Sequence, residues 1–181
     1  QAGLPWISNS ELVAAVSNAG GLGILRSTAG IEPGGDVIAN MQANIRRVQR
    51  ITHNPFGVAL YLPHPQIQEI IAAGVQEGMK IAITYGGSPA LYTGMLKEHD
   101  NIVMHQVVTV RHARGAEAQG VDIVIAEGFE GGGLRGPDKV STMVLVPQIA
   151  GSVTIPVVAS GGIVDSRGYV SALALGAQGI Q

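Results

Sequence analysis

Cysteine is absent from this chain, and charged residues are scarce. Zero cysteines among 181 residues exclude a disulfide framework and thiolate metal sites, and they fit the reducing cytoplasm in which we expect the protein to work. Eleven basic residues against 13 acidic ones give a net charge of −2, so the chain lacks the basic field that attracts nucleic acid or an anionic membrane. We therefore expect neither nucleic acid nor a membrane as a partner.

One long stretch, Met143 to Val164, carries no charge and raises the question of a membrane span. Pro147, Gly151 and Pro156 interrupt it, so a helix followed by a buried strand explains it better. The amino terminus also lacks the basic region and cleavage site of a signal peptide. These features predict a protein without a membrane anchor.

Short apolar runs alternate with segments of helical period along the whole chain. Hydrophobic residues make up 46% of the chain, which suits strands covered on both faces. Strands that alternate with helices predict a parallel sheet with right-handed crossovers. The expected strands are Gly21–Leu25, Phe56–Leu60, Lys80–Thr84, Ile102–Val107, Val121–Ala126 and Ile155–Ala159.

Polar residues and glycines mark the expected helix ends. Ser8 and Glu11 fit a capping box at the start of the first helix, and Gly20 is its expected stop. Further expected caps are Ser88, Thr109, Ser141 and Ser166, and further expected stops are Gly120 and Gly176.

Both ends of the chain resemble pieces of strands. Gln1-Ala2-Gly3 is typical of the last residues of a strand, and Gly179-Ile180-Gln181 of the first. Together with the complete runs they predict a TIM-type (β/α)₈ barrel, clipped in its first and last strands, as one domain over residues 1–181. An open doubly wound sheet is the alternative. Clipped edges favour a partner chain at the gap, such as a second copy in a homo-oligomer, or poor solubility.

Glycines and polar residues follow two of the expected strands. Glu127-Gly128 and a glycine cluster follow the run from Val121, and Ser160-Gly161-Gly162 follows the run from Ile155. Gly161 and Gly162 let backbone N–H groups approach a phosphate, which the positive end of the next helix also attracts. A tight turn that needs positive φ is the alternative, but phosphate is favoured because barrels commonly bind it at this strand.

Two further patterns give weaker signals. Gly131, Gly133 and Gly136 spell G-x-G-x-x-G, but the next strand lacks the acidic end of a dinucleotide site and Pro137 interrupts the helix. His105 lies in an expected strand, where a structural role is favoured over a catalytic one. No close set of histidines and carboxylates predicts a metal site.

The whole chain resembles the nitronate monooxygenases, formerly called 2-nitropropane dioxygenases, and the related flavin-dependent enoyl-acyl-carrier-protein reductases. The resemblance is carried by WISNSELVAAVSNAGGLGIL (6–25), NPFGVAL (54–60), TVRHA (109–113), EGFEGGGLRG (127–136), LVPQIA (145–150) and IPVVASGGIVDSRGYVSALALGAQGIQ (155–181).

The resemblance implies a barrel that holds FMN noncovalently. It places Gln1, Ala2 and Gly3 near the isoalloxazine ring and makes Gly162 a phosphate-binding glycine. It also implies flavin contacts for Glu127 and Gly132, and Gln181 begins the last phosphate-binding motif.

Three departures from the family pattern bear on activity. Leu134 stands where the family has the histidine that acts on substrate, and Ala59 stands where it has an asparagine near the flavin. The M-G-T residues that complete phosphate binding in the family would follow Gln181. Leucine cannot transfer a proton, although flavin chemistry itself needs no such base.

The resemblance implies an enzyme with a small-molecule substrate, and together with its departures it leaves three functions as hypotheses. The first is FMN-dependent oxidation of alkyl nitronates by oxygen. The second is NAD(P)H-dependent reduction of an enoyl thioester or quinone by the same flavin. The third is a catalytically silent barrel or fragment that binds a ligand or partner, which Leu134 favours.

Overall fold

The structure is a computed structural model that describes residues 1–31 and 34–181. It shows an α/β fold with seven strands and intervening helices, in two compact units. The first unit comprises residues 1–87 and 95–102, and the second comprises residues 88–94 and 103–181. No described helix has the length and apolarity needed to cross a membrane.

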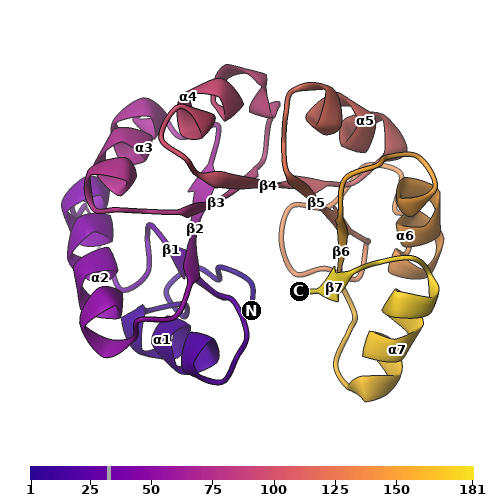
Figure 1. Cartoon of the computed structure of the whole chain (residues 1–181), viewed down its shortest axis with the longest axis horizontal. Helices are drawn as coiled ribbons and strands as arrows, with labels where there is room; N and C mark the ends of the chain where they lie inside the picture. Colours follow the sequence, from indigo (N-terminus) through magenta and orange to yellow (C-terminus); the bar gives the residue numbers. More distant parts are fainter. Residues whose placement is uncertain (32–33) are drawn as a thin grey trace. The chain divides into compact units, whose positions relative to one another are not determined.

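The first unit contains three parallel strands, β1 (Gly23–Arg26), β2 (Phe56–Tyr61) and β3 (Ile81–Tyr85), adjacent in that order. Helices α1 (Ser10–Asn18), α2 (Val37–Ile51) and α3 (Ile67–Gln76) pack along one side of them, as Figure 1 shows in indigo and purple. The chain then forms a 3₁₀ turn, η1 (Pro89–Leu91), and the short α4 (Thr93–Lys97), where it passes from one unit to the other. Buried apolar side chains such as Leu25, Met41 and Leu60 fill the space between helices and strands.

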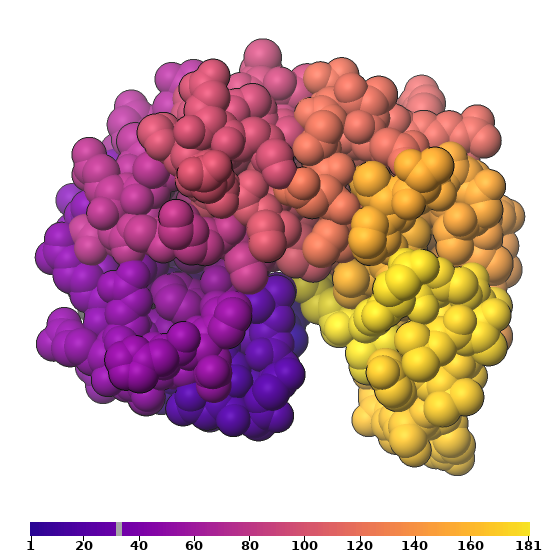
Figure 2. All heavy atoms as spheres, in the orientation of Figure 1, coloured from indigo at the N-terminus to yellow at the C-terminus, as the bar shows by residue number. Residues whose placement is uncertain are grey.

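The second unit contains the other strands, also parallel: β4 (Ile102–Val107), β5 (Ile123–Glu127), β6 (Val157–Ser160) and β7 (Gly179–Ile180). They follow one another in chain order. Helices α5 (Val110–Ala118), α6 (Thr142–Ala150) and α7 (Ser166–Ala174) pack against them (Figure 1). The yellow end of the chain, which includes α7, forms an outer surface of this unit (Figure 2).

The structure confirms a strand at each of the six predicted runs, although the first or last residues of most of these strands differ from those predicted. The pairs of neighbouring strands given for each unit are parallel, and Val58, Ile83, Val103, Val124 and Val157 are buried. Leu22 falls within the expected strand Gly21–Leu25, but it lies before β1 and is only half-buried. The reason is that the Gly20 amide donates to the Ser17 carbonyl and the Gly21 amide donates to the Val16 carbonyl. These bonds continue the end of α1 as far as Gly21.

Two expectations about the amino terminus are wrong. The first helix is capped by Asn9, whose side chain accepts from the Leu12 amide, and not by Ser8. Gln1-Ala2-Gly3 is not a strand, because the Ser8 hydroxyl holds this segment in a turn: Ser8 Oγ accepts from the Leu4 amide at 2.7 Å and donates to the Ala2 carbonyl at 3.0 Å. At the other end, Gly179-Ile180 does begin a strand, β7.

Candidate functional site

The carboxyl ends of β5, β6 and β7 bring several predicted site residues together in the second unit. Glu127 is the register partner of Ser160, so both side chains lie on the same face of the sheet. The Gln181 amide donates to the Ala159 carbonyl at 2.8 Å, and the Ser160 hydroxyl lies 3.4 Å from Gln181 Oε1. Glu127, Ser160 and Gln181 therefore form one polar edge.

Glu127 is a buried carboxyl at this edge, with 7% of its surface exposed. Burial raises its pKa, while a hydrogen bond from the Gly133 amide and the charge of Arg135 act in the opposite direction. A Cβ added at Gly131 would collide with this carboxyl, so glycine is required there for the loop to pack over Glu127. The site thus holds a carboxyl whose ionisation is disfavoured.

The glycine-rich loop after β5 is fixed by Thr142, which the sequence did not single out. The Thr142 amide donates to the Glu130 carboxylate at 2.9 Å, and the Thr142 hydroxyl lies 2.8 Å from the Gly161 carbonyl. The Glu130 carboxylate therefore caps the start of α6. Ser141, the expected cap, precedes α6 but makes no capping bond with its side chain. These bonds tie the loop to the turn after β6.

The turn at Gly161-Gly162 has two properties of an anion site. Its φ angles are +106° and +73°, which only glycine adopts readily. In the part of the chain that the structure describes, the amides of Gly161, Gly162 and Ile163 donate no hydrogen bond. Successive unpaired N–H groups at a positive-φ turn form a concave nest that suits a phosphate. Gly161 also has a packing role, because a Cβ there would lie 2.9 Å from the Gly131 nitrogen.

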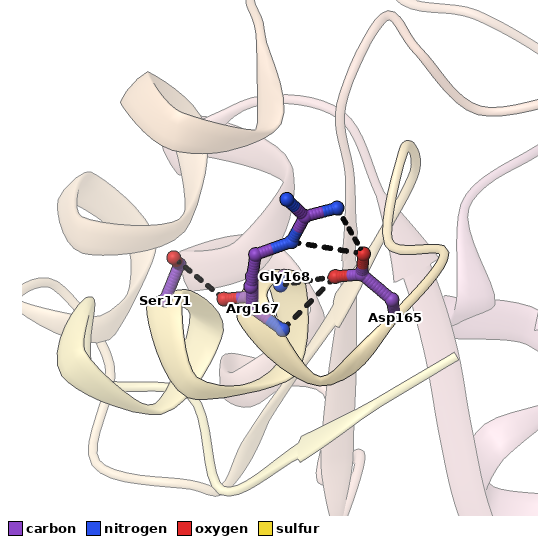
Figure 3. Close-up of polar contacts among 4 residues, drawn as sticks. All are labelled: Asp165, Arg167, Gly168 and Ser171. Carbon is purple, nitrogen blue, oxygen red and sulfur yellow. Dashed lines mark hydrogen bonds and ion pairs between the residues drawn. The ribbon is translucent and has the colours of Figure 1, made fainter.

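The start of α7 is less available to a phosphate than the sequence predicted. Asp165, not Ser166, is the cap, and its carboxylate accepts from the Arg167 and Gly168 amides at 2.9 and 3.4 Å (Figure 3). The Arg167 guanidinium pairs with the same carboxylate at 2.5 Å, and the Ser171 hydroxyl donates back to the Arg167 carbonyl. Because Asp165 already accepts from the amides of the helix start, the nest itself, rather than the helix end, is the part that can hold a phosphate.

Two loop positions singled out from the sequence are open. Leu134 is 49% exposed, and a Cβ added at Gly132 would meet no atom within 4 Å. The neighbouring Arg135 guanidinium lies over the Phe129 ring, 5.1 Å from its centre, and its Nε donates to the Gly131 carbonyl at 3.1 Å. A ligand can therefore reach the loop beside Leu134.

His105 lies away from this edge. Its register partner is Val124, so alternation along the strands places both on the face opposite to Glu127. His105 is 4% exposed, which fits the structural role that the sequence favoured. Its neighbour Gln106, the partner of Ile125, shares the face of Glu127 and is half-buried. Within the described residues, no group of three or more histidines and carboxylates could hold a metal ion.

The remaining predicted cofactor residues, Gln1, Ala2 and Gly3, belong to the first unit. Gly3 lies against β2, since a Cβ there would be 2.9 Å from Ala59 Cβ. The Gly3 carbonyl accepts from Arg26 Nη1 at 3.2 Å. The segment therefore rests on the face that carries Ala59 and Arg26, which are register partners.

Comparisons with known proteins agree with the fold. A family model described as nitronate monooxygenase matches residues 1–181. FabK from Thermotoga maritima superposes with a TM-score of 0.91 at 38% identity, over 100% of this chain and 56% of that one.

Two curated relatives cover the same region. One is (3aS,4S,5R,7aS)-5-hydroxy-7a-methyl-1-oxo-octahydro-1H-indene-4-carboxyl-CoA dehydrogenase of Mycobacterium tuberculosis, 34% identical over 99% of this chain and 49% of its own length. The other is a probable nitronate monooxygenase of Staphylococcus haemolyticus, 31% identical over 100% of this chain and 62% of its own length. The chain thus spans 49% and 62% of the length of these two relatives.

Proposed function

Because this chain belongs to the nitronate monooxygenase family, we propose that it is an FMN-dependent oxidoreductase that oxidises alkyl nitronates with oxygen. When bound, FMN would take up electrons from the substrate and pass them to oxygen. We also propose that the two units are parts of a TIM-type (β/α)₈ barrel. The parallel strands alternating with helices support that arrangement.

The observation that carries the proposal is the nest after β6. The unpaired amides of Gly161, Gly162 and Ile163 would hold the FMN phosphate, with Gln181 at the neighbouring strand end. Glu127 and the open Gly132 would contact the flavin from the second unit. Gln1, Ala2 and Gly3 would contact the isoalloxazine ring from the first unit, held in place by Ser8.

The residues present suit a substrate that arrives already ionised. A nitronate is an anion, so its oxidation needs no group to remove a proton. Leu134 offers an apolar surface that can contact the hydrocarbon part of such a substrate, but it cannot act as a base.

The proposal is tested by mixing the FMN-loaded chain anaerobically with propyl-2-nitronate and following flavin absorbance. We expect the visible band to bleach and to return when oxygen is admitted. A parallel sample receives neutral 2-nitropropane at the same concentration, and there we expect slow bleaching at most. If nitronate leaves the band unchanged, this chain does not oxidise nitronates.

A thioester substrate is the second candidate, because the relative that is 34% identical is named as a dehydrogenase of a carboxyl-CoA compound. In that case NAD(P)H would reduce the flavin, and an enoyl thioester or a quinone would reoxidise it. Rapid bleaching by NADH or NADPH together with none by nitronate would favour this function over the first.

A further inference from the structure

A cluster of three side chains stands at the carboxyl ends of the strands of the first unit. Arg26, Tyr61 and Tyr85 are the last residues of β1, β2 and β3. Tyr61 and Tyr85 are register partners, and Arg26 is in register with Ala59, two residues before Tyr61. Alternation therefore places all three on one face of the sheet.

The three side chains are in contact. The Arg26 guanidinium carbon lies 4.7 Å from the centre of the Tyr85 ring. The rings of Tyr61 and Tyr85 are 5.3 Å apart at an angle of 35°. Stacking on a ring fixes the plane of a guanidinium and leaves its N–H groups directed outward at its edge.

Two groups of this cluster lack the partners that their burial calls for. The Tyr85 hydroxyl is inaccessible to solvent, in a residue that is 7% exposed, and it has no hydrogen-bond partner among residues 1–31 and 34–181. The Arg26 guanidinium is half-buried, and the only bond found for it in that part of the chain is to the Gly3 carbonyl. A buried hydroxyl without a hydrogen-bond partner is unfavourable, and so is a half-buried cation without a carboxylate.

One kind of ligand satisfies both groups. The Tyr85 phenol is protonated at neutral pH, since burial raises its pKa to about 12, so its hydroxyl can donate a hydrogen bond to a ligand. Arg26 has only donors. A ligand that accepts from a hydroxyl and a guanidinium together, and that compensates a positive charge, is an oxyanion.

We propose that Arg26 and Tyr85 form a binding site for an oxyanion, such as a carboxylate-like group or a phosphate of a ligand, with Tyr61 on its solvent side. Tyr61 is 37% exposed and is the member of the cluster that solvent reaches most. The site is distinct from the Gly161–Ile163 nest, which belongs to the second unit, and it does not depend on the proposed flavin chemistry.

The test is an NMR titration of the chain with acetate and, separately, with inorganic phosphate, at constant ionic strength kept with chloride. The Arg26 Nε–H signal is assigned as the one that Arg26→Lys removes. We expect that signal to shift saturably with at least one of the two anions. Acetate as the tighter ligand would identify a planar carboxylate-like group, and phosphate as the tighter ligand would identify a phosphate.

Tyr85→Phe separates binding from folding. Because the hydroxyl has no partner in the free protein, its removal should leave the melting temperature equal or higher, while the dissociation constant for the anion rises at least about fivefold. Tyr169→Phe, at an exposed tyrosine of α7, should change neither quantity. Absence of a saturable shift with both anions would overturn the proposal, as would unchanged affinity in Tyr85→Phe.

Discussion

Glu127 shows at the scale of one residue how the site affects stability. Since burial raises its pKa in the folded protein, folding binds a proton between the unfolded and folded pKa values, and stability falls as pH rises through that range. Glu127→Gln removes the buried charge. We therefore expect the variant to melt higher than the unmodified chain at neutral pH, by roughly 2–4 °C if the gain is about 1 kcal/mol. The difference should vanish below about pH 4.5, the ordinary value for a glutamate.

Glu117→Gln is the matched control with the opposite sign. The Glu117 carboxylate accepts from the Thr154 hydroxyl and amide at 2.7 and 2.6 Å, and these bonds lower its pKa. This variant should melt lower than the unmodified chain at neutral pH, and the loss should disappear on acidification. Thermal melts from pH 3.5 to 8 check both residues. Equal pH dependence in the two variants would show that burial does not raise the pKa of Glu127.

The proposed function predicts that this chain cannot remove a proton from its substrate at Leu134, because leucine carries no base. Leu134→His places an imidazole at an exposed loop position, where it can exchange protons near neutral pH. We expect the variant to gain turnover of neutral nitroalkanes, with a rate that rises with pH through about 6–7, the ordinary histidine range. Oxygen consumption at a series of pH values measures this. Efficient oxidation of neutral nitroalkanes by the unmodified chain would contradict the role given to Leu134.

Some residues of the site could be predicted from the sequence and others could not. Glu127, Gly161 and Gly162 stand out because they come at the ends of apolar runs, and the structure confirms that Glu127 ends β5 and that Gly161 and Gly162 follow β6. The Thr142 hydroxyl bonds to the Gly161 carbonyl, which is distant in the sequence, and the Ser8 hydroxyl bonds to the Ala2 carbonyl, which precedes it. No local sequence pattern reveals either bond. The Arg26–Tyr85 contact depends on the register between strands, which is likewise set by packing and not by local sequence.

At the scale of elements, glycine at the ends of helices was the most dependable signal. Gly20, Gly120 and Gly176 all have positive φ just after α1, α5 and α7. Helix starts were less predictable, since Asn9 and Asp165 act as caps next to the residues expected. Several polar residues near a helix start can cap it, and the tertiary position of the preceding loop decides which one does.

Helix α5 offers a paired test of glycine as the signal for a helix end. Gly115 is exposed inside the helix, and a Cβ there would meet no atom within 4 Å. Gly115→Ala should therefore stabilise the chain by about 0.5–1 kcal/mol, because alanine loses less backbone entropy in a helix. Gly120→Ala should destabilise it by roughly 1 kcal/mol, because Gly120 has a φ of +80°. Urea unfolding measures both, and stabilisation by Gly120→Ala would contradict the assigned end of α5.

At the scale of the whole molecule, the two units are interleaved in sequence. Residues 88–94 belong to the second unit and residues 95–102 to the first, so neither unit is a continuous stretch of chain. We expect a single unfolding transition, with equal calorimetric and van't Hoff enthalpies, because neither unit can unfold without pulling on a segment of the other. Differential scanning calorimetry measures this, and two separate transitions would show that the units unfold independently.

We propose that the nest after β6 holds the phosphate of FMN, and a comparison of FMN with riboflavin tests this contact. Riboflavin lacks the phosphate, so the ratio of the two dissociation constants isolates that contact. Fluorescence quenching should show FMN binding at least about tenfold more tightly, since one charge-assisted hydrogen bond is worth about 1.5–3 kcal/mol. Gly162→Val, with its fold checked by circular dichroism, should abolish the preference and leave riboflavin affinity unchanged. Equal affinity for the two flavins in the unmodified chain would show that the nest does not hold the phosphate.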